Sequence, residues 1–260
     1  RDIQRLIGSY TSLAARLKDK IDLFTMELAA NPEITTAQVY KMARFKTLIS
    51  SIEAELAKYN AYLEIELGQI ADAAMRQAML DSAALIRMAA GNVGITGSFG
   101  GLNAGAVRAI TSMLAPDSPL YQRLHELAGL MAGRISGKII EGVGLGYGYE
   151  KLGRMIVGDL GLGLSDALRW ARTSQMTAYR ETSRATMLEN SSIIDGWTWF
   201  AQLDDATCTG PGSCSEQHGT FHTSEESLND LTIHIWNCRC VELPHVIGDS
   251  NPITGQPVES

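Results

Sequence analysis

The stretch IQRLIGSYTSLAARLKDKIDLFTMEL, residues 3–28, indicates the fold class of this chain. Its apolar side chains recur at alternating intervals of four and three residues, which places them on one face of an α-helix. The members of this apolar stripe are Ile3, Ile7, Tyr10, Ala14, Leu17, Ile21, Phe24 and Leu28. Pro32 cannot continue the interior of a helix, and Thr35 or Thr36 can cap the next one. We therefore predict a long first helix that ends before Pro32.

A second stripe with the same spacing follows this break. It consists of Met42, Phe45, Ile49, Ile52, Leu56, Tyr59 and Leu63. We expect this second helix to run on to Ala90. Two long helices joined by a short break predict an antiparallel helical hairpin. In one interpretation the two stripes pack only against each other inside the hairpin. In the other they also bind a partner helix, because two helices alone bury little apolar surface.

Further helices are predicted in the middle of the chain. Residues 91–105 are rich in glycine, and a turn with Pro116 and Pro119 follows them. We expect one helix to start just after this turn. Two more helices, joined by glycines, are expected at 149–160 and from 164 onward.

The pattern changes after residue 195. The segment GWTWFAQL alternates in the way a strand does, with Trp197 and Trp199 on one face, and residues 231–235 are a second strand candidate. The last residues are rich in Pro, Gly and Ser and show no periodicity, so they predict an extended or disordered tail.

These observations predict a mainly α protein that carries a small C-terminal α+β module. The expected division is a long helical hairpin at 1–90, a Gly-rich helical connecting region at 91–160, the small module with a Cys/His cluster at 161–245 and the tail at 246–260.

All four cysteines of the chain lie within one short stretch of the small module. Cys208 and Cys214 form a C-x5-C pair, and Cys238 and Cys240 form a C-x-C pair with His234 just upstream. Two short-range pairs brought together by a loop are typical of a tetrahedral zinc site, and such a site can staple a small module. The predicted ligands of a structural zinc ion are therefore these four cysteines and His234, which can replace one cysteine of the C-x-C pair.

Two other interpretations of the cysteines stay open. Disulfide bonds would require an oxidising compartment, for which the sequence gives no evidence. A catalytic thiol would need a base beside it, and a lone nucleophile does not need four clustered thiols.

The charge distribution argues against a nucleic-acid-binding surface in the C-terminal part. The chain has a net charge of −7. Between Asp195 and Glu259 there are ten acidic residues and one basic residue, which gives −9 and leaves +2 for the remainder. Phosphate backbones bind surfaces rich in Lys and Arg.

No apolar run approaches the ~18 residues of a membrane span, so no membrane partner is expected.

The order of features from Gly142 to Pro244 resembles the phage head morphogenesis family, which includes the Mu F-like minor head proteins and the minor head protein of the Bacillus phage SPP1. The resemblance rests on the helix ARTSQMTAYRETSRATMLEN, the strand and turn GWTWFAQLDDATC, a second cysteine, and the ending HIWNCRCVELP. It covers the C-terminal module and leaves out the helical N-terminal part.

The resemblance implies a structural minor capsid protein. We do not expect the protein to be an enzyme. Its partners would be the portal protein, the major capsid protein or both, with several copies around the portal. The protein would be assembled in the bacterial host cytoplasm and located in the virion head, near the portal vertex. Some relatives travel with the genome into the host, so ejection with the DNA is a further expectation.

Two alternative functions are retained. A metal-dependent enzyme, or a toxin-like effector delivered with the phage, would use a hydrolytic site built from His218, His222 and His234 with Asp204 or Glu216. Against this, Asp204 and Asp205 are expected to be solvated or to cap the turn that precedes the first cysteine. A DNA-contacting internal head protein would use the Arg and Lys residues of the first 155 positions.

Overall fold

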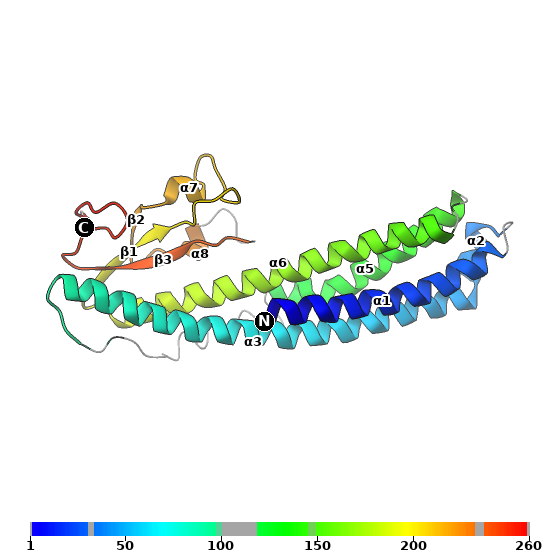
Figure 1. Cartoon of the computed structure of the whole chain (residues 1–260), viewed down its shortest axis with the longest axis horizontal. Helices are drawn as coiled ribbons and strands as arrows, with labels where there is room; N and C mark the ends of the chain where they lie inside the picture. The colour runs from blue at the N-terminus through cyan, green and yellow to red at the C-terminus, as the bar shows by residue number, and fades with distance from the viewer. Residues whose placement is uncertain are drawn as a thin grey trace. The chain divides into compact units, whose positions relative to one another are not determined.

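A computed structural model describes residues 2–30, 34–97, 99, 119–145, 147, 149–231 and 237–258. It is mainly helical, as predicted, with one small antiparallel sheet near the C-terminus (Figure 1). The helices are α1 (Asp2–Ala29), α2 (Thr36–Lys41), α3 (Ala43–Asn92), α5 (Pro119–Gly144), α6 (Tyr149–Glu189), α7 (Cys214–Gln217) and α8 (Leu228–Leu231). The strands are β1 (Ile194–Phe200), β2 (Phe221–Thr223) and β3 (Val241–Val246).

The chain folds into two compact units, and each unit is built from two segments. The first contains Arg1–Leu67 and Pro116–Ala171, and the second contains Gly68–Ala115 and Arg172–Ser260. The long helices α3 and α6 therefore each contribute to both units. The sequence predicted a different division, into consecutive segments at 1–90, 91–160, 161–245 and 246–260. That division stays a prediction.

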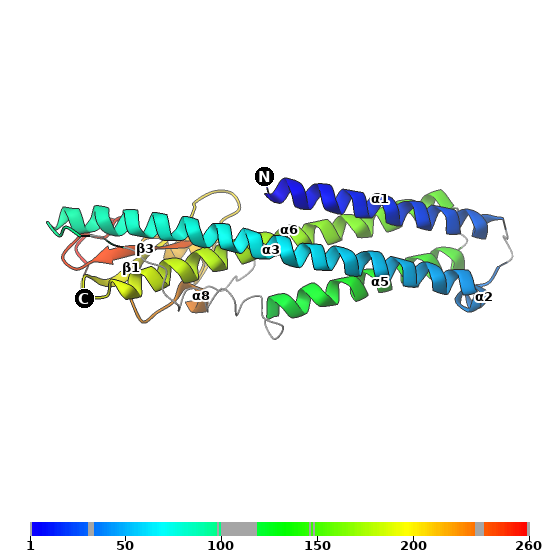
Figure 2. The ribbon, with the colours of Figure 1, turned by 90° about the horizontal axis from the view of Figure 1, so that it is seen from below.

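Helix α1 contacts the first part of α3 within the first unit (Figure 2). Ion pairs join Arg5 to Glu66 at 3.1 Å, Arg16 to Glu55 at 2.9 Å and Arg44 to Glu27 at 2.5 Å. Tyr10 packs edge-on against Tyr59, with ring centroids 5.2 Å apart. Residue numbers fall along α3 as they rise along α1 in all these pairs.

The buried face of α1 differs from the predicted stripe in its first half. The buried apolar residues are Leu6, Tyr10, Leu13, Leu17, Ile21, Phe24 and Leu28. Leu6 and Leu13 thus replace Ile7 and Ala14, which are only half-buried. Burial of Leu13 in place of its neighbour Ala14 removes more apolar surface from water.

The break between the first two long helices is built as the sequence predicted. Thr35 caps α2, because its hydroxyl accepts a hydrogen bond from the backbone N–H of Gln38 at 3.4 Å. The Gln38 side chain in turn accepts a hydrogen bond from the backbone N–H of Thr35 at 2.7 Å, which completes a capping box. Met42 was expected to lie within the second long helix, but it has extended backbone geometry and separates α2 from α3.

Helix α6 is longer than predicted. The glycines at 161 and 163 were expected to separate two helices, but one helix of 41 residues runs through both. Each glycine costs about 1 kcal/mol relative to Ala in a helix interior, which tertiary packing readily overrides. The predicted helix after Pro119 is confirmed as α5, and Pro119 occupies its first position.

The small sheet has the order β2-β1-β3, and both pairings are antiparallel. The predicted aromatic strand is confirmed as β1, in which Trp197 and Trp199 are 1% and 2% exposed. The second strand was predicted at residues 231–235. Leu231 instead ends helix α8, and residues 232–235 lie outside the described residues. The two strands that do pair with β1 were not predicted.

The second unit has its core where the sheet meets the ends of α3 and α6. Ile86 of α3 and Met187 of α6 pack in one apolar cluster with Trp197 and Trp199. A buried hydrogen bond of 2.9 Å joins Ser82 to Ser183 and ties the two helices together. Three of the cysteines belong to this same core.

The described part of the C-terminal tail folds back on itself, and this corrects the prediction of an extended segment. Asn251 organises the turn, since its side-chain oxygen accepts hydrogen bonds from the backbone of Ile253 at 2.9 Å and Thr254 at 3.1 Å. Its side-chain amide donates to the carbonyl of Gly219 at 2.9 Å. These local side-chain bonds give the tail a fixed structure without an apolar pattern in its sequence.

Candidate metal centre

Three cysteine sulfurs gather at one end of the sheet. Cys214 begins α7, and Cys238 and Cys240 lie just before β3. Their sulfurs all lie within 4.8 Å of one another, and all three residues are buried. The sulfurs of Cys214 and Cys238 are 4.0 Å apart. Thiolates around a tetrahedral zinc ion, each about 2.3 Å from it, lie about 3.8 Å from one another. These three cysteines could therefore bind a metal ion, and their geometry leaves the type of metal open.

The fourth cysteine lies beside this group. Cys208 is half-buried, and its sulfur accepts a hydrogen bond from the backbone N–H of Cys214 at 3.1 Å. It lines the same cavity, of about 140 Å³, as the other three cysteines. The remaining lining residues are Ala201, Gln202, Ala206, Thr207, Asn237 and Arg239. His234, the fifth predicted ligand, lies outside the described residues.

A buried arginine holds the loop that carries the second cysteine pair. Arg180 of α6 is 2% exposed. Its guanidinium donates from Nε to the carbonyl of Cys240 at 2.9 Å and from Nη2 to the carbonyl of Cys238 at 3.0 Å. Asn237, just before the loop, has a φ of 61°, in the left-handed region that Asn tolerates better than most residues. The C-x-C loop is thus held through its backbone, and both of its cysteines line the cavity.

An exposed ion pair links the two cysteine-bearing segments. Arg239 pairs with Asp204 through two contacts of 2.5 Å each. The Arg239 guanidinium lowers the pKa of the Asp204 carboxyl, and the backbone N–H of Ala206 lowers it further. That N–H donates to Asp204 at 3.0 Å, so Asp204 caps this turn, which is one of the two roles expected of it.

The pKa values of the buried thiols depend on whether a cation is bound. Burial, and then the hydrogen bond with Cys208, raises the pKa of the Cys214 thiol to about 12. The pKa of Cys240 is also raised, first by its hydrogen bond with the Cys238 thiol and then by burial. The indole N–H of Trp199 acts in the opposite direction. A bound cation would stabilise the thiolates and reverse these upward shifts.

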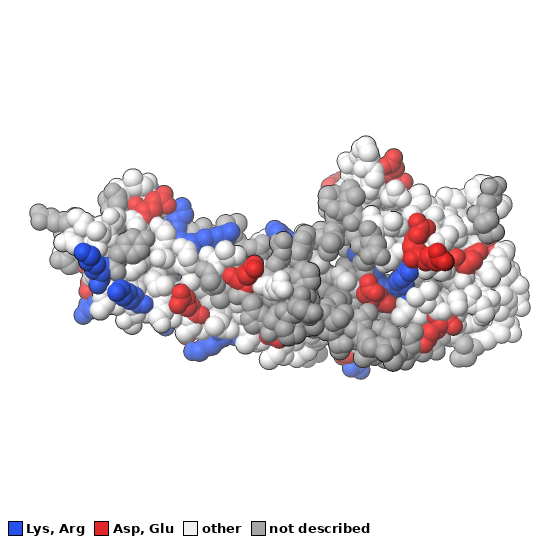
Figure 3. All heavy atoms as spheres, turned by 180° about the vertical axis from the view of Figure 1, so that it is seen from behind, with Lys and Arg blue, Asp and Glu red and all other residues white. Residues whose placement is uncertain are grey.

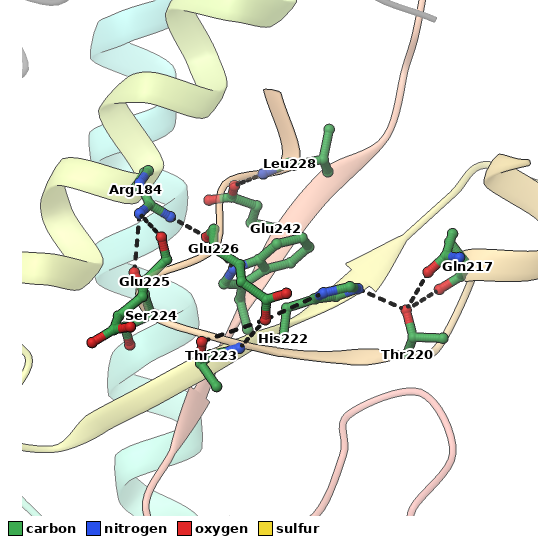
Figure 4. A network of polar contacts seen from close by, with 11 residues as sticks. Arg184, Gln217, Thr220, His222, Thr223, Ser224, Glu225, Glu226, Leu228 and Glu242 are labelled. Carbon is green, nitrogen blue, oxygen red and sulfur yellow. Dashed lines mark hydrogen bonds and ion pairs between the residues drawn. The ribbon is translucent and has the colours of Figure 1, made fainter. Parts of the chain in front are cut away.

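The described histidines of the module serve its fold. His218 accepts a hydrogen bond from the backbone N–H of Ala201 at 3.0 Å. His222 stacks on Trp197 with ring centroids 4.5 Å apart. Its two ring nitrogens face Thr220 at 3.0 Å and Glu226 at 3.6 Å (Figure 4). None of the histidines in the described ranges lies within the group of three sulfurs.

Two further side chains shape the same module, the half-buried Arg184 and the buried Glu242. Arg184 of α6 donates to the backbone carbonyls of Ser224, Glu225 and Glu226, and so holds the turn after β2 (Figure 4). Glu242 of β3 is 4% exposed and accepts a hydrogen bond from the backbone N–H of Leu228 at 2.8 Å. Burial raises the pKa of Glu242 to about 7.

Comparison of the chain with protein-family models, with curated proteins and with solved structures gave no match. Among the described residues, no helix has the length and apolarity needed to cross a membrane.

The cysteines have a clear signal in the sequence, and the residue that holds their loop does not. Arg180, whose guanidinium donates to the carbonyls of Cys238 and Cys240, carries no spacing signal of its own. A weak signal for Arg180 was available, because it lies among small and hydroxyl-bearing residues that form a buried face of α6. A charged residue on such a face is expected to have a fixed polar partner.

Proposed function

We propose that this chain is a structural minor head protein of a tailed bacteriophage, which binds the portal or the capsid interior during head assembly. One observation carries the proposal. The separate sequence pieces behind the resemblance to the head morphogenesis family come together in one module: the Trp strand β1, Cys208 with its preceding turn, Cys214, and the NCRC ending. They meet at one apolar cluster and the cavity beside it, which supports a common structural unit.

The module is stapled by a structural zinc ion in this proposal. Cys214, Cys238 and Cys240 would supply three thiolates, and Cys208 or His234 would supply the fourth ligand. Soft thiolate ligands favour zinc over Mg²⁺ or Ca²⁺, and a site filled by four protein ligands is closed to substrate. The ion would supply folding energy by holding the 208–214 segment against the loop before β3.

The first unit supplies the docking element in this proposal. Helix α1 and the first part of α3 would act as an antiparallel hairpin that binds the portal or a neighbouring capsid protein. Leu23 and Met26 support this role, since they lie about one turn apart on α1 and are 71% and 53% exposed. Exposed apolar side chains on a helix face can bind a partner helix.

The enzyme alternative is less well supported, because the residues it needs are used by the fold. A catalytic zinc keeps one coordination position open for water, usually beside a general base. The described candidates are engaged elsewhere: His218 and His222 bond within the sheet, Asp204 pairs with Arg239, and Glu216 accepts from the backbone N–H of Gly212 at 2.5 Å.

The alternative of DNA contact gains no support from the surface charges. On the face shown in Figure 3, acidic and basic side chains of the described residues are interspersed, and acidic ones predominate over the second unit. A salt-dependent gel shift with the full chain tests this alternative.

The proposal is tested by counting the protein in purified particles of the phage that encodes it, with quantitative mass spectrometry. We expect a few to a few dozen copies per particle, and their loss from particles assembled without the portal protein. Abundance in the infected cell combined with absence from particles would overturn the proposal and favour the enzyme.

A further inference from the structure

The indole N–H of Trp199 is a buried donor without a satisfied acceptor. Trp199 is 2% exposed, and its Nε1 forms no hydrogen bond of normal geometry with any described group. Its neighbour on the same face of β1 is different, since Trp197 donates from Nε1 to the carbonyl of Glu226 at 2.9 Å. A buried donor left unpaired destabilises the folded state. An unpaired N–H at this position therefore points to an acceptor that becomes available in another state of the site.

The sulfur of Cys240 is the acceptor that the geometry offers. Trp199 and Cys240 pack in the same apolar cluster, and Cys240 directly precedes the strand that pairs with β1. The register pairs Phe200 with Val241, so Cys240 comes next to the partner of Phe200 and close to Trp199 along the strand pair. From the other side, Arg180 holds the carbonyl of Cys240 at 2.9 Å. The backbone of this cysteine is thus fixed, and its sulfur stays within the reach of the indole.

The charge on the sulfur decides the strength of this contact. A neutral thiol is a weak acceptor, and the thiolate that ligates a metal carries negative charge. Hydrogen bonds to charged acceptors are shorter and roughly twice as strong as bonds between neutral groups. Partners that hydrogen-bond to metal ligands orient them and raise metal affinity.

We propose that Trp199 is a positioning residue of the metal centre, whose indole N–H donates a hydrogen bond to the Cys240 sulfur when that sulfur is a metal-bound thiolate. This inference rests on the proposed thiolate metal site. It assigns Trp199 a role that Trp197 does not share, although the two side chains lie on one face with ring centroids 5.9 Å apart.

The chain offers a matched pair of variants for the test. Trp199→Phe removes the N–H that faces the sulfur, and Trp197→Phe removes an N–H that is bonded to a carbonyl. Each full-length variant is stripped of metal under reducing conditions and titrated with Co²⁺, and the sulfur-to-cobalt charge-transfer absorption reports binding. Zn²⁺ affinity follows from competition with a chromogenic chelator. We expect Trp199→Phe to weaken metal binding roughly tenfold or more and Trp197→Phe to leave it nearly unchanged.

A measurement on the wild-type chain covers the case in which a variant does not fold. In ¹⁵N-labelled protein, the Trp199 indole N–H resonance should move downfield when Zn²⁺ is added, while that of Trp197 should stay in place. An unmoved Trp199 resonance in a chain that binds zinc overturns the inference, as does equal affinity of Trp199→Phe and wild type. A wild-type chain that binds neither Co²⁺ nor Zn²⁺ overturns the metal site itself, so the two failures are distinct.

Discussion

Replacement of Gly196 by alanine should strongly destabilise the sheet that supports the candidate metal centre. Gly196 lies in β1 beside a register irregularity and faces Thr223 of β2 and His245 of β3. A methyl group at this position would lie 2.2 Å from the carbonyl oxygen of His222 and 2.4 Å from the nearest ring atom of Phe221. Neither distance is compatible with van der Waals contact.

The magnitude follows from which atoms must move. The Phe221 ring can turn aside, but the carbonyl belongs to the strand that pairs with β1, so relief requires the two strands to separate. Overpacking in a well-packed interior costs about 1–3 kcal/mol, and a clash with backbone should reach the upper end of that range. We expect the free energy of unfolding of the second unit to fall by about 3 kcal/mol. Urea unfolding followed by tryptophan fluorescence reports this unit, because Trp197 and Trp199 are in its core.

Gly91→Ala is the matched control. Gly91 lies in the part of α3 that belongs to the second unit, and no atom outside the helix backbone lies within 4 Å of an added methyl group there. Alanine is about 1 kcal/mol more favourable than glycine in a helix interior, so this variant should be slightly more stable than wild type. Equal stabilities of Gly196→Ala and wild type would refute the reasoning about the close approach of β2 to β1.

Three further predictions concern other sites. Cys238→Ser should release bound metal and abolish the protection of backbone amides in the sheet, while α1 and the first part of α3 keep their protection. Hydrogen exchange detected by mass spectrometry checks this, and a sheet that stays as protected as in wild type would contradict it. Tyr59→Phe should leave stability unchanged or raise it by up to about 1 kcal/mol in thermal unfolding, because the buried Tyr59 hydroxyl bonds to no described group. Burial raises the pKa of Glu242 to about 7, above the ~4.3 of an unfolded chain, so its contribution to stability is most favourable below about pH 4 and declines up to about pH 7. Glu242→Gln should remove that decline and be more stable than wild type at pH 8, and a variant with the wild-type pH dependence would show that another group is responsible.

The helices were predictable because their signals are local and periodic. Tyr10, Leu17 and Ile21 recur at helical spacing and are buried on the face that the sequence indicates. The capping box at Thr35 is also local, as it depends on residues three positions apart. The register in the first half of α1 was not predictable, since Ile7 and Leu6 fit the spacing equally well until a partner helix selects between them.

The strands beside β1 could not be predicted for a different reason. Strand β3 contains Pro244 and the buried Glu242, two residue types that argue against a strand. The sheet order places β3 at an edge, where a proline that lacks an N–H is tolerated. Strand β2 has three residues and is too short to show alternation. Both depend on the tertiary contact with β1.

The cysteines of the site were evident from the sequence, and their supports were not. The clustering of thiols in a short stretch predicted that several would meet, and Cys214, Cys238 and Cys240 do. Arg180 is 58 and 60 residues away from the two carbonyls that it holds, and no spacing rule connects such positions. The interaction of Trp199 with Cys240 likewise depends on the pairing of β1 with β3.

The most direct measurement is the metal content of the full chain, purified under reducing conditions without added metal, together with the number of thiols that react with a chromogenic disulfide reagent. We predict about one zinc ion per chain and thiols that become reactive only after a strong chelator removes the metal. The proposed structural zinc site would be contradicted by a chain that contains no metal and whose four cysteines all react while the sheet stays folded.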